Sequence, residues 1–255
     1  MFRRQFLGLG LSAFILPARA RPAATVAAAS DLKFALDEVV AEYARATGEQ
    51  VRVTYGSSGN FARQIEQGAP FDLFMSADED FVRVLSARGL TLDDGTAYAV
   101  GRIVLFASNP PAFGLDPEMK GLAAALDAGR IRRFALANPE HAPYGRAARE
   151  ALQATGVWPA IEPRLVLGEN VSQAAQFAAG GNTAGGIFAL SLALVPGIAG
   201  RGAHAVLPET LHRPLRQRMV LMRRAGPQAR AFYRHLTEPA ARQILQRYGF
   251  RLPGQ

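Results

Sequence analysis

A serine-rich turn followed by a short helical pattern is the segment of this chain best suited to binding chemistry. Residues 55–78 read YGSSGNFARQIEQGAPFDLFMSAD. Ser57 and Ser58 lie in a glycine-flanked turn, and Gly68 ends the helical pattern of residues 60–67. Free backbone N–H groups at a helix start, together with the positive end of the helix dipole, attract an anion without any lysine or arginine. The two hydroxyl groups add donors, so this segment predicts an anion-binding site.

Three further helix starts offer hydrogen-bond donors from other directions. Ser30 follows a strand-like apolar stretch and precedes a helical pattern that begins near Asp31, so it serves either as a plain N-cap or as a ligand. Tyr144 lies just before a second helical pattern, where a tyrosine most often packs half-buried against its neighbours. Asn170 suits the N-cap position of a third helical pattern. The N–H of Val171, at the first position of that helix, would then be free.

Four blocks of the sequence resemble the periplasmic molybdate-binding proteins of ABC importers. Residues 55–78 carry the pattern S-S-x-x-x-A-R-Q-I-x-x-G-A-P-x-D-L-F-x-S-A-D, which follows the second strand in that family. AAASDLKFALDEV at residues 27–39 is similar to the family's opening strand and ligand serine. NPEHAPYGRAAREAL at residues 138–152 and RYGF at residues 247–250 follow in the expected order. The resemblance covers residues 25–252.

The resemblance implies ligand-binding roles for Ser30, Ser58, Tyr144 and Val171. The two serines match the family's ligand serines. Tyr144 falls where family members contact the anion mainly through backbone N–H, although some relatives use a tyrosine hydroxyl, and Val171 matches a backbone donor. The only metal implied is the molybdenum inside molybdate, which these residues would hold through the oxygen atoms of the anion. Neighbouring positions that could share in the site are Asp31, Ser57, Gly59 and Ala189.

One position departs from the resembling family. Many relatives carry a tyrosine in the strand that matches residues 185–190, and the hydroxyl of that tyrosine binds the ligand. This chain has Phe188 and Ala189 there. The missing hydroxyl leaves two interpretations open: Tyr144 replaces it from across the pocket, or the site prefers another ligand.

Other residue patterns suggest chemistry but lack the partners that it needs. Glu140 and His141 could begin a catalytic or metal site, yet no third group is visible nearby in the sequence. Asp72 and Asp78 are expected to be a turn residue and a helix N-cap. The sequence contains no G-x-S-x-G, P-loop or H-E-x-x-H pattern. We therefore expect a binding protein that is not an enzyme and that needs no cofactor.

The composition limits the kinds of partner. At 255 residues and 49% hydrophobic residues, the chain can bury a core. Its net charge of +8 comes from arginines scattered through helical patterns, not clustered with aromatic residues on one face, so nucleic-acid binding is not expected. A general positive field would speed the capture of anions. The sequence has no cysteine, which excludes disulfides, thiolate metal sites and a lipid-anchoring cysteine.

The first residues have the features of a cleaved export signal. Residues 1–20 begin with Arg3 and Arg4, continue with an apolar run at residues 6–16 and end in small residues. A transmembrane helix needs about 20 apolar residues, so this run is too short to span a bilayer. The two arginines also fit a twin-arginine motif, with an ordinary secretory signal as the alternative. The mature chain is expected to be a free periplasmic monomer.

Strand-like and helical patterns alternate along the chain, which predicts an α/β fold. Strands are expected at residues 25–29, 50–55, 73–76, 102–107, 134–136, 164–166, 185–189 and 218–222. Helices are expected at residues 32–47, 60–67, 79–88, 146–155, 172–179, 227–236 and 238–247. Gly48 is expected to end the first helix as a C-cap.

The resemblance implies a two-lobed fold like that of periplasmic binding proteins, each lobe a mixed sheet flanked by helices, with the ligand cleft between the lobes. Lobe 1 would comprise residues 25–101 and 206–255, and lobe 2 residues 102–205. The implied function is that of the substrate-binding component of a molybdate ABC transporter. It would capture molybdate, and also tungstate, for the importer's permease subunits.

Two groups of alternatives stay open. The first is a binding protein for sulfate, phosphate or an organic anion, and the second is an exported sensor or enzyme on the same fold. A phosphate site would be expected to include an acceptor such as an aspartate, and the sequence suggests none among the four helix starts.

Overall fold

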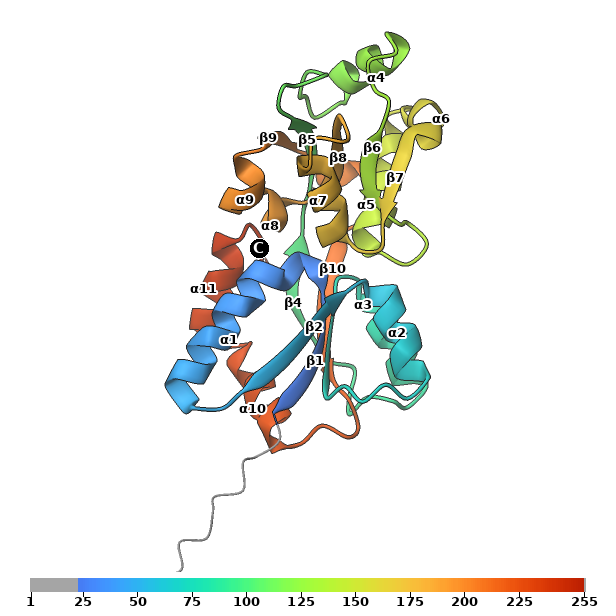
Figure 1. The fold of residues 1–255 in the computed structure, drawn as a ribbon. Coiled ribbons are helices and arrows are strands. Elements are labelled where there is room, and N and C mark those ends of the chain that lie inside the picture. Colours follow the sequence, from blue (N-terminus) through green and yellow to red (C-terminus); the bar gives the residue numbers. More distant parts are fainter. Residues whose placement is uncertain (1–22, 255) are drawn as a thin grey trace, which may run out of the picture.

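The chain forms two five-stranded sheets placed one above the other in Figure 1, in a computed structural model that describes residues 23–254. The first sheet, ordered β2-β1-β3-β10-β4, contains β1 (Ala24–Ala29), β2 (Val51–Gly56), β3 (Leu73–Ser76), β4 (Thr96–Gly101) and β10 (Leu215–Leu221). The second, ordered β7-β6-β8-β5-β9, contains β5 (Ile103–Ser108), β6 (Phe134–Ala137), β7 (Leu165–Gly168), β8 (Gly185–Ala189) and β9 (Gly202–Val206).

Both sheets are mixed and share one pattern of pairing. In the first, β1 pairs in parallel with β2 and β3, while β10 runs antiparallel to β3 and β4. In the second, β6 pairs in parallel with β7 and β8, while β5 runs antiparallel to β8 and β9. The chain passes from the first sheet to the second between β4 and β5, and it returns between β9 and β10. Two strand connections therefore join the two halves.

Helices cover both faces of the sheets (Figure 1). Around the first sheet lie η1 (Ser30–Leu32), α1 (Lys33–Thr47), α2 (Ser58–Glu66), α3 (Glu79–Ala87), α10 (Pro227–His235) and α11 (Pro239–Arg247). With the second sheet are α4 (Lys120–Asp127), α5 (Pro143–Ala154), α6 (Trp158–Ile161), η2 (Glu162–Arg164), α7 (Val171–Ala179), α8 (Leu190–Ala193) and α9 (Pro196–Ala199), and η3 (Glu209–Leu211) precedes β10. No helix within residues 23–254 has the length and apolar character needed to cross a membrane.

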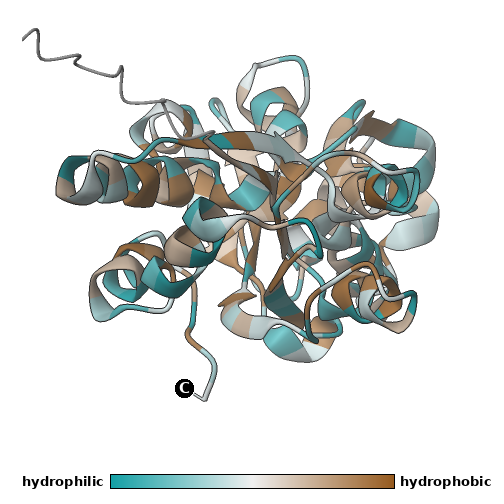
Figure 2. Cartoon of the chain, turned by 90° about the horizontal axis from the view of Figure 1, so that it is seen from below, coloured by the Kyte–Doolittle hydropathy of each residue, from teal (hydrophilic) through white to brown (hydrophobic). Residues whose placement is uncertain are grey.

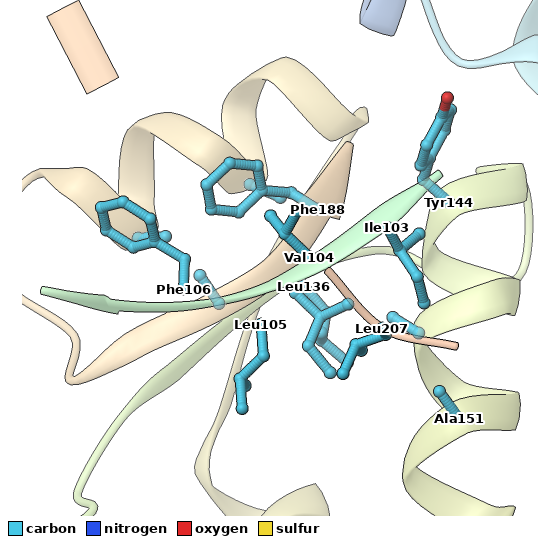
Figure 3. Close-up of a cluster of buried hydrophobic side chains, with 14 of the residues drawn as sticks. Ile103, Val104, Leu105, Phe106, Leu136, Tyr144, Ala151, Phe188 and Leu207 are labelled. Carbon is cyan, nitrogen blue, oxygen red and sulfur yellow. The ribbon is translucent and has the colours of Figure 1, made fainter. Parts of the chain in front are cut away.

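Each sheet has its own hydrophobic core. Alternate residues of β1 face opposite sides of the first sheet: Val26 packs in the cluster beneath α1 and α10, and Ala27 packs in the cluster beneath α2 and α3. Every residue of β5 is buried, and its residues 103–107 belong to the second core, where the ring centroids of Phe106 and Phe188 lie 5.3 Å apart (Figure 3). In the view from below, hydrophobic and hydrophilic residues alternate along the helices (Figure 2). Three hydrophobic clusters therefore stabilise the molecule, and the cluster of the second sheet also includes Ala29, Ala77 and Leu215 of the first half.

The predicted fold class is confirmed, while several element boundaries were wrong. The second helix begins at Ser58 and not at residue 60, because Ser57 caps it. The helix predicted from residue 146 begins at Pro143, which suits a first helical position. The prediction missed β4, which is separated from β5 by a single residue and merges with it into one apolar run. It also missed the short elements β9, α4, α6, α8 and α9. Gly48 ends α1 in a left-handed conformation (φ 73°), as predicted.

Candidate functional site

Four helix starts meet at one pocket between the two sheets. The space that the centre of a water molecule can occupy in this pocket is about 10 Å³, and all four predicted ligand residues line it: Ser30, Ser58, Tyr144 and Val171. A cavity needs about 10–15 Å³ of such space to hold one water molecule, so this pocket suits a small ion better than an organic molecule. Of the four predicted neighbours, Asp31 and Ser57 also line the pocket, whereas Gly59 and Ala189 do not. No lysine or arginine belongs to the wall.

The start of α2 contributes a hydroxyl whose proton is free. Ser58 is fully buried, and its Oγ accepts a hydrogen bond from the backbone N–H of Ala77 at 2.9 Å. Because this bond uses a lone pair, the hydroxyl proton remains available to an anion. Ser57 caps the helix by accepting from the N–H of Asn60 at 3.4 Å, so it shapes the turn.

Ser30 connects the two halves of the molecule. Its Oγ donates to Oδ1 of Asn170 at 3.0 Å and accepts from the N–H of Ser172 at 3.2 Å. The hydroxyl of Ser172 in turn donates to the backbone oxygen of Ser30 at 2.8 Å. The start of η1 and the start of α7 are therefore held together, and the Ser30 hydroxyl would turn from Asn170 to donate to a ligand.

The second half of the molecule contributes backbone donors. Helix α5 has Pro143 at its first position and no side-chain cap, so the N–H groups of Tyr144 and Gly145 have no partner inside the helix. At the start of α7, Asn170 accepts from the N–H of Gln173, which leaves the N–H of Val171 unpaired within the helix. Both helices direct the positive end of their dipole toward the pocket.

The hydroxyl of Tyr144 is occupied by protein groups. It donates to Oδ2 of Asp31 at 2.9 Å and accepts from Nε2 of Gln217 at 3.1 Å. Tyr144 belongs to the same buried cluster as Phe188, and in Figure 3 its hydroxyl points away from the other labelled side chains. Phe188 has no hydroxyl, and the hydroxyl of Tyr144 is already paired, so neither ring presents a free hydroxyl to the pocket. The free donor of Tyr144 is its backbone N–H.

Asp31 overturns one expectation from the sequence, namely that no aspartate acceptor lies among the helix starts. Its side chain is buried and lines the pocket. Burial raises the pKa of the carboxyl group to about 6, against the lowering effect of hydrogen bonds from Gln217 and Tyr144 and of the backbone N–H groups of Asp31 and Leu32. The position of Asp31 next to Ser30 was the available signal. The sequence could not show that the 3-10 turn buries both residues against the same pocket.

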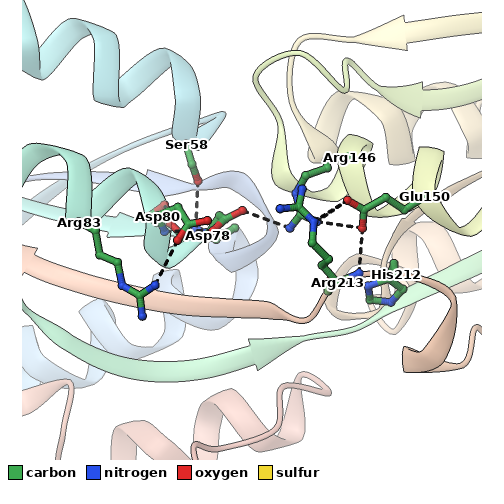
Figure 4. Close-up of polar contacts among 10 residues, drawn as sticks. Ser58, Asp78, Asp80, Arg83, Arg146, Glu150, His212 and Arg213 are labelled. Carbon is green, nitrogen blue, oxygen red and sulfur yellow. Dashed lines mark hydrogen bonds and ion pairs between the residues drawn. The ribbon is translucent and has the colours of Figure 1, made fainter.

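The two halves are closed on the pocket and touch around its rim. The N–H of Gly59 donates to the backbone oxygen of His141 at 3.0 Å. Arg146 of α5 forms an ion pair with Asp78 at 3.1 Å, and these two side chains point toward one another in Figure 4. Glu150, which pairs with Arg146, also accepts from Arg213 at 2.9 Å. These contacts define a closed arrangement of the two sheets.

The other residues with chemical potential have structural partners. His141 shares a hydrogen bond between Nδ1 and Ser57 at 2.9 Å. Asp78 caps α3 by accepting from the N–H of Asp80, as predicted, and Asp72 accepts from both the N–H and the hydroxyl of Thr25. Among residues 23–254, no group of three or more acidic, histidine or cysteine side chains is arranged to hold a metal ion.

Comparisons with known proteins point to one group. A family model described as bacterial extracellular solute-binding protein matches residues 24–251. The chain is 36% identical over 216 residues to the molybdate-binding protein ModA of Rhodobacter capsulatus, covering 84% of this chain and 82% of the relative. It is 32% identical over 250 residues to ModA of Azotobacter vinelandii, covering 96% and 97%. The solved periplasmic molybdate-binding protein of Azotobacter vinelandii superposes with a TM-score of 0.82 at 29% identity, covering 90% of this chain and 99% of that structure.

Proposed function

The chain belongs to the bacterial extracellular solute-binding proteins, and we propose that it is the substrate-binding component of a molybdate ABC transporter. The observation that carries this proposal is the meeting of four helix starts at one small buried pocket. Hydroxyl and N–H donors reach this pocket from both sheets, while the wall has no lysine or arginine. A small anion with several oxygens satisfies such donors from several directions at once.

The number of donors is sufficient for useful affinity. A dissociation constant of about 1 μM corresponds to about 8 kcal/mol, and a hydrogen bond to a charged group contributes about 1.5–3 kcal/mol. About five to seven donors therefore suffice after the costs of desolvation and closure. We assign them to the hydroxyls of Ser30 and Ser58, the N–H groups of Tyr144 and Val171, and adjoining backbone N–H groups.

The proposed ligand class is a tetrahedral dianion. Tungstate has the same charge and shape as molybdate, so we infer that the pocket takes both. Sulfate is smaller and would leave some donors too distant. The relatives are named as binding proteins, and the proposed role needs neither catalysis nor a resident cofactor.

We propose that the two lobes move as units, residues 25–101 with 206–255 against residues 102–205. The two strand connections between the sheets would form the hinge. A ligand shifts such an equilibrium through contacts that exist only in the closed form, and donors on both sides of the pocket provide them. The permease subunits of the importer would recognise the closed form of a monomeric binding protein.

We further propose that the protein acts in the periplasm after export. The family description as extracellular supports this location. The export signal expected at residues 1–20, whether of the twin-arginine or of the ordinary secretory type, lies outside the described residues and stays a prediction.

Titration calorimetry tests the function directly. The mature chain, residues 21–255, would be titrated with molybdate, tungstate, sulfate and phosphate in a buffer free of all four. We expect one-to-one binding of molybdate and tungstate in the micromolar range or tighter, with sulfate and phosphate at least about a hundredfold weaker. Preferred binding of sulfate or phosphate, or heat from none of the four, would contradict the proposal.

Tyr144→Phe tests which part of Tyr144 serves the ligand. The substitution keeps the backbone N–H and removes the hydroxyl that donates to Asp31, so molybdate affinity is expected to fall less than tenfold. Loss of a buried hydrogen bond is expected to lower the free energy of unfolding by about 1–2 kcal/mol. Tyr233→Phe, which removes a hydroxyl bonded to Thr96 far from the pocket, is the matched control. A hundredfold loss of affinity would instead mean that the hydroxyl contacts the anion.

A further inference from the structure

One oxygen of Asp31 is a buried acceptor without a partner beside a pocket that otherwise presents donors. In the part of the chain that the structure describes, five buried side-chain polar atoms lack a hydrogen-bond partner, and Oδ1 of Asp31 is one of them. It is the only one of the five that belongs to a residue of the pocket wall. Buried polar atoms are nearly always paired, so an unpaired carboxylate oxygen at a ligand pocket indicates a missing partner.

The surroundings of the other oxygen, Oδ2, fix where a proton on this carboxyl group would sit. Oδ2 accepts from the hydroxyl of Tyr144 at 2.9 Å and from Nε2 of Gln217 at 2.6 Å. Tyr98 donates to Oε1 of Gln217 at 2.7 Å, which turns the amide NH₂ toward Asp31. Burial raises the pKa of both tyrosines well above the ordinary value, so both remain donors. Because Oδ2 is filled by donors, a proton on Asp31 must be carried by Oδ1.

No cation compensates the charge of Asp31. The elements around it present Tyr98 from β4, Tyr144 from α5 and Gln217 from β10, and the backbone N–H groups of Asp31 and Leu32 also favour its ionised form. Ser191 of α8 donates to the backbone oxygen of Asp31 at 2.8 Å. Within residues 23–254 the carboxyl group forms no ion pair, and the two tyrosines are the titratable groups that face it. A dianion placed next to an ionised Asp31 would meet an uncompensated like charge in a desolvated site.

We propose that Asp31 is a further ligand of the oxyanion, and that its Oδ1 carries a proton that it donates to an oxygen of the bound dianion. The proposal deepens the function inferred above and rests on it. One proton passes from solvent to Oδ1 as the anion enters, and no bond of the anion breaks. The like-charge contact is thereby converted into a hydrogen bond. Binding of a fully deprotonated tetrahedral dianion is thus coupled to the uptake of one proton.

This coupling has a defined dependence on pH. The free carboxyl group has a pKa of about 6, and a neighbouring dianion favours the protonated form further. Above about pH 6, each unit of pH reduces the protonated fraction of the free protein about tenfold, so the dissociation constant for molybdate is expected to rise by the same factor. Between about pH 6.5 and 8.5 the affinity should therefore fall about a hundredfold.

Calorimetry on the wild-type protein and Asp31→Asn tests the proposal. Molybdate would be titrated from about pH 6.5 to 8.5, in two buffers that differ in enthalpy of ionisation, which gives the number of protons taken up. We expect uptake of one proton by the wild type at the upper end of this range. In Asp31→Asn the amide oxygen can replace Oδ2 and the NH₂ group can replace the protonated Oδ1, so we expect no proton uptake, a constant affinity and tighter binding than wild type at pH 8.5. Asp37→Asn, at a half-exposed position of α1, should keep the wild-type profile.

The outcomes separate this proposal from the function on which it rests. Molybdate binding by the wild type with no proton uptake and no dependence on pH would overturn the role of Asp31 and leave the function standing. Preferred binding of phosphate without proton uptake would make Asp31 an acceptor and overturn the proposal. An absence of binding by either protein at every pH would overturn both.

Thermal unfolding without ligand checks the buried carboxyl group independently. Since its folded-state pKa is raised from 3.8 to about 6, wild-type stability should decrease as pH rises through this interval and then level off. The melting temperature of Asp31→Asn should therefore be higher than that of the wild type above about pH 6. Near pH 4 the two melting temperatures should be similar. Equal differences in melting temperature at both pH values would contradict the buried, uncompensated carboxylate.

Discussion

Gly59→Ala is expected to lower the affinity for molybdate by at least about a hundredfold while the unliganded protein stays folded. In the closed arrangement the N–H of Gly59 contacts the backbone oxygen of His141 at 3.0 Å. A methyl group on Gly59 would lie 2.7 Å from that oxygen and 3.1 Å from the Cα of His141. Backbone atoms cannot move aside as a flexible side chain does, so the two lobes could not approach fully.

The effect of this substitution should be confined to closure. Alanine favours a helix over glycine by about 1 kcal/mol, so α2 itself is not weakened. A hundredfold loss of affinity corresponds to about 2.7 kcal/mol. The energetic cost of a contact so far below van der Waals distance is larger than this. Gly197→Ala in α9, where the added methyl group meets nothing within 4 Å, is the matched control. Calorimetric titration with parallel thermal unfolding gives both quantities, and wild-type affinity in Gly59→Ala would contradict the closed arrangement as the binding form.

Ser58→Ala is expected to reduce molybdate affinity by about tenfold to 150-fold, through loss of a hydrogen bond to a charged group that contributes about 1.5–3 kcal/mol. The hydroxyl is fully buried, and its lone pair is already used by the N–H of Ala77, so its proton is available to the ligand. The same substitution leaves the Ala77 N–H without its partner and should lower the free energy of unfolding by about 1–3 kcal/mol.

These two consequences of Ser58→Ala are separable. Titration well below the melting temperature measures affinity in folded protein, and denaturant unfolding without ligand measures stability. Ser86→Ala is the matched control, because Ser86 lies on α3 away from the pocket and its hydroxyl donates to Asp94. This substitution should leave molybdate affinity unchanged. If Ser58→Ala binds molybdate as tightly as the wild type, Ser58 is a structural residue and not a ligand.

Local signals in the sequence were enough to predict the main elements and to select residues that the fold brings together. The glycine-flanked serine turn and the capping residue Asn170 mark helix starts wherever they occur. The order of the family-like blocks placed those starts in a two-lobed α/β fold, and Ser30, Ser58, Tyr144 and Val171 line one pocket. Their roles as ligands stay a prediction.

The hydrogen-bond network around Asp31 could not be predicted in the same way. Asp31 is 113 residues from Tyr144 and 186 residues from Gln217 in the sequence, so no local pattern connects them. Gln217 also lies at a register shift in β10 where the pairing with β4 is irregular. Such irregularities redirect side chains, and alternation along a strand does not reveal them. The chemistry of the site therefore depends on contacts that only the folded chain creates.

Anomalous diffraction from a crystal of the molybdate complex would locate molybdenum without any assumption about where it binds. We expect one strong peak in the pocket between the lobes, with anion oxygens within hydrogen-bond distance of the Ser30 and Ser58 hydroxyls and of the Tyr144 and Val171 N–H groups. We further expect an anion oxygen next to Oδ1 of Asp31. A peak elsewhere, with this pocket empty in crystals grown at saturating molybdate, would contradict the proposed binding site.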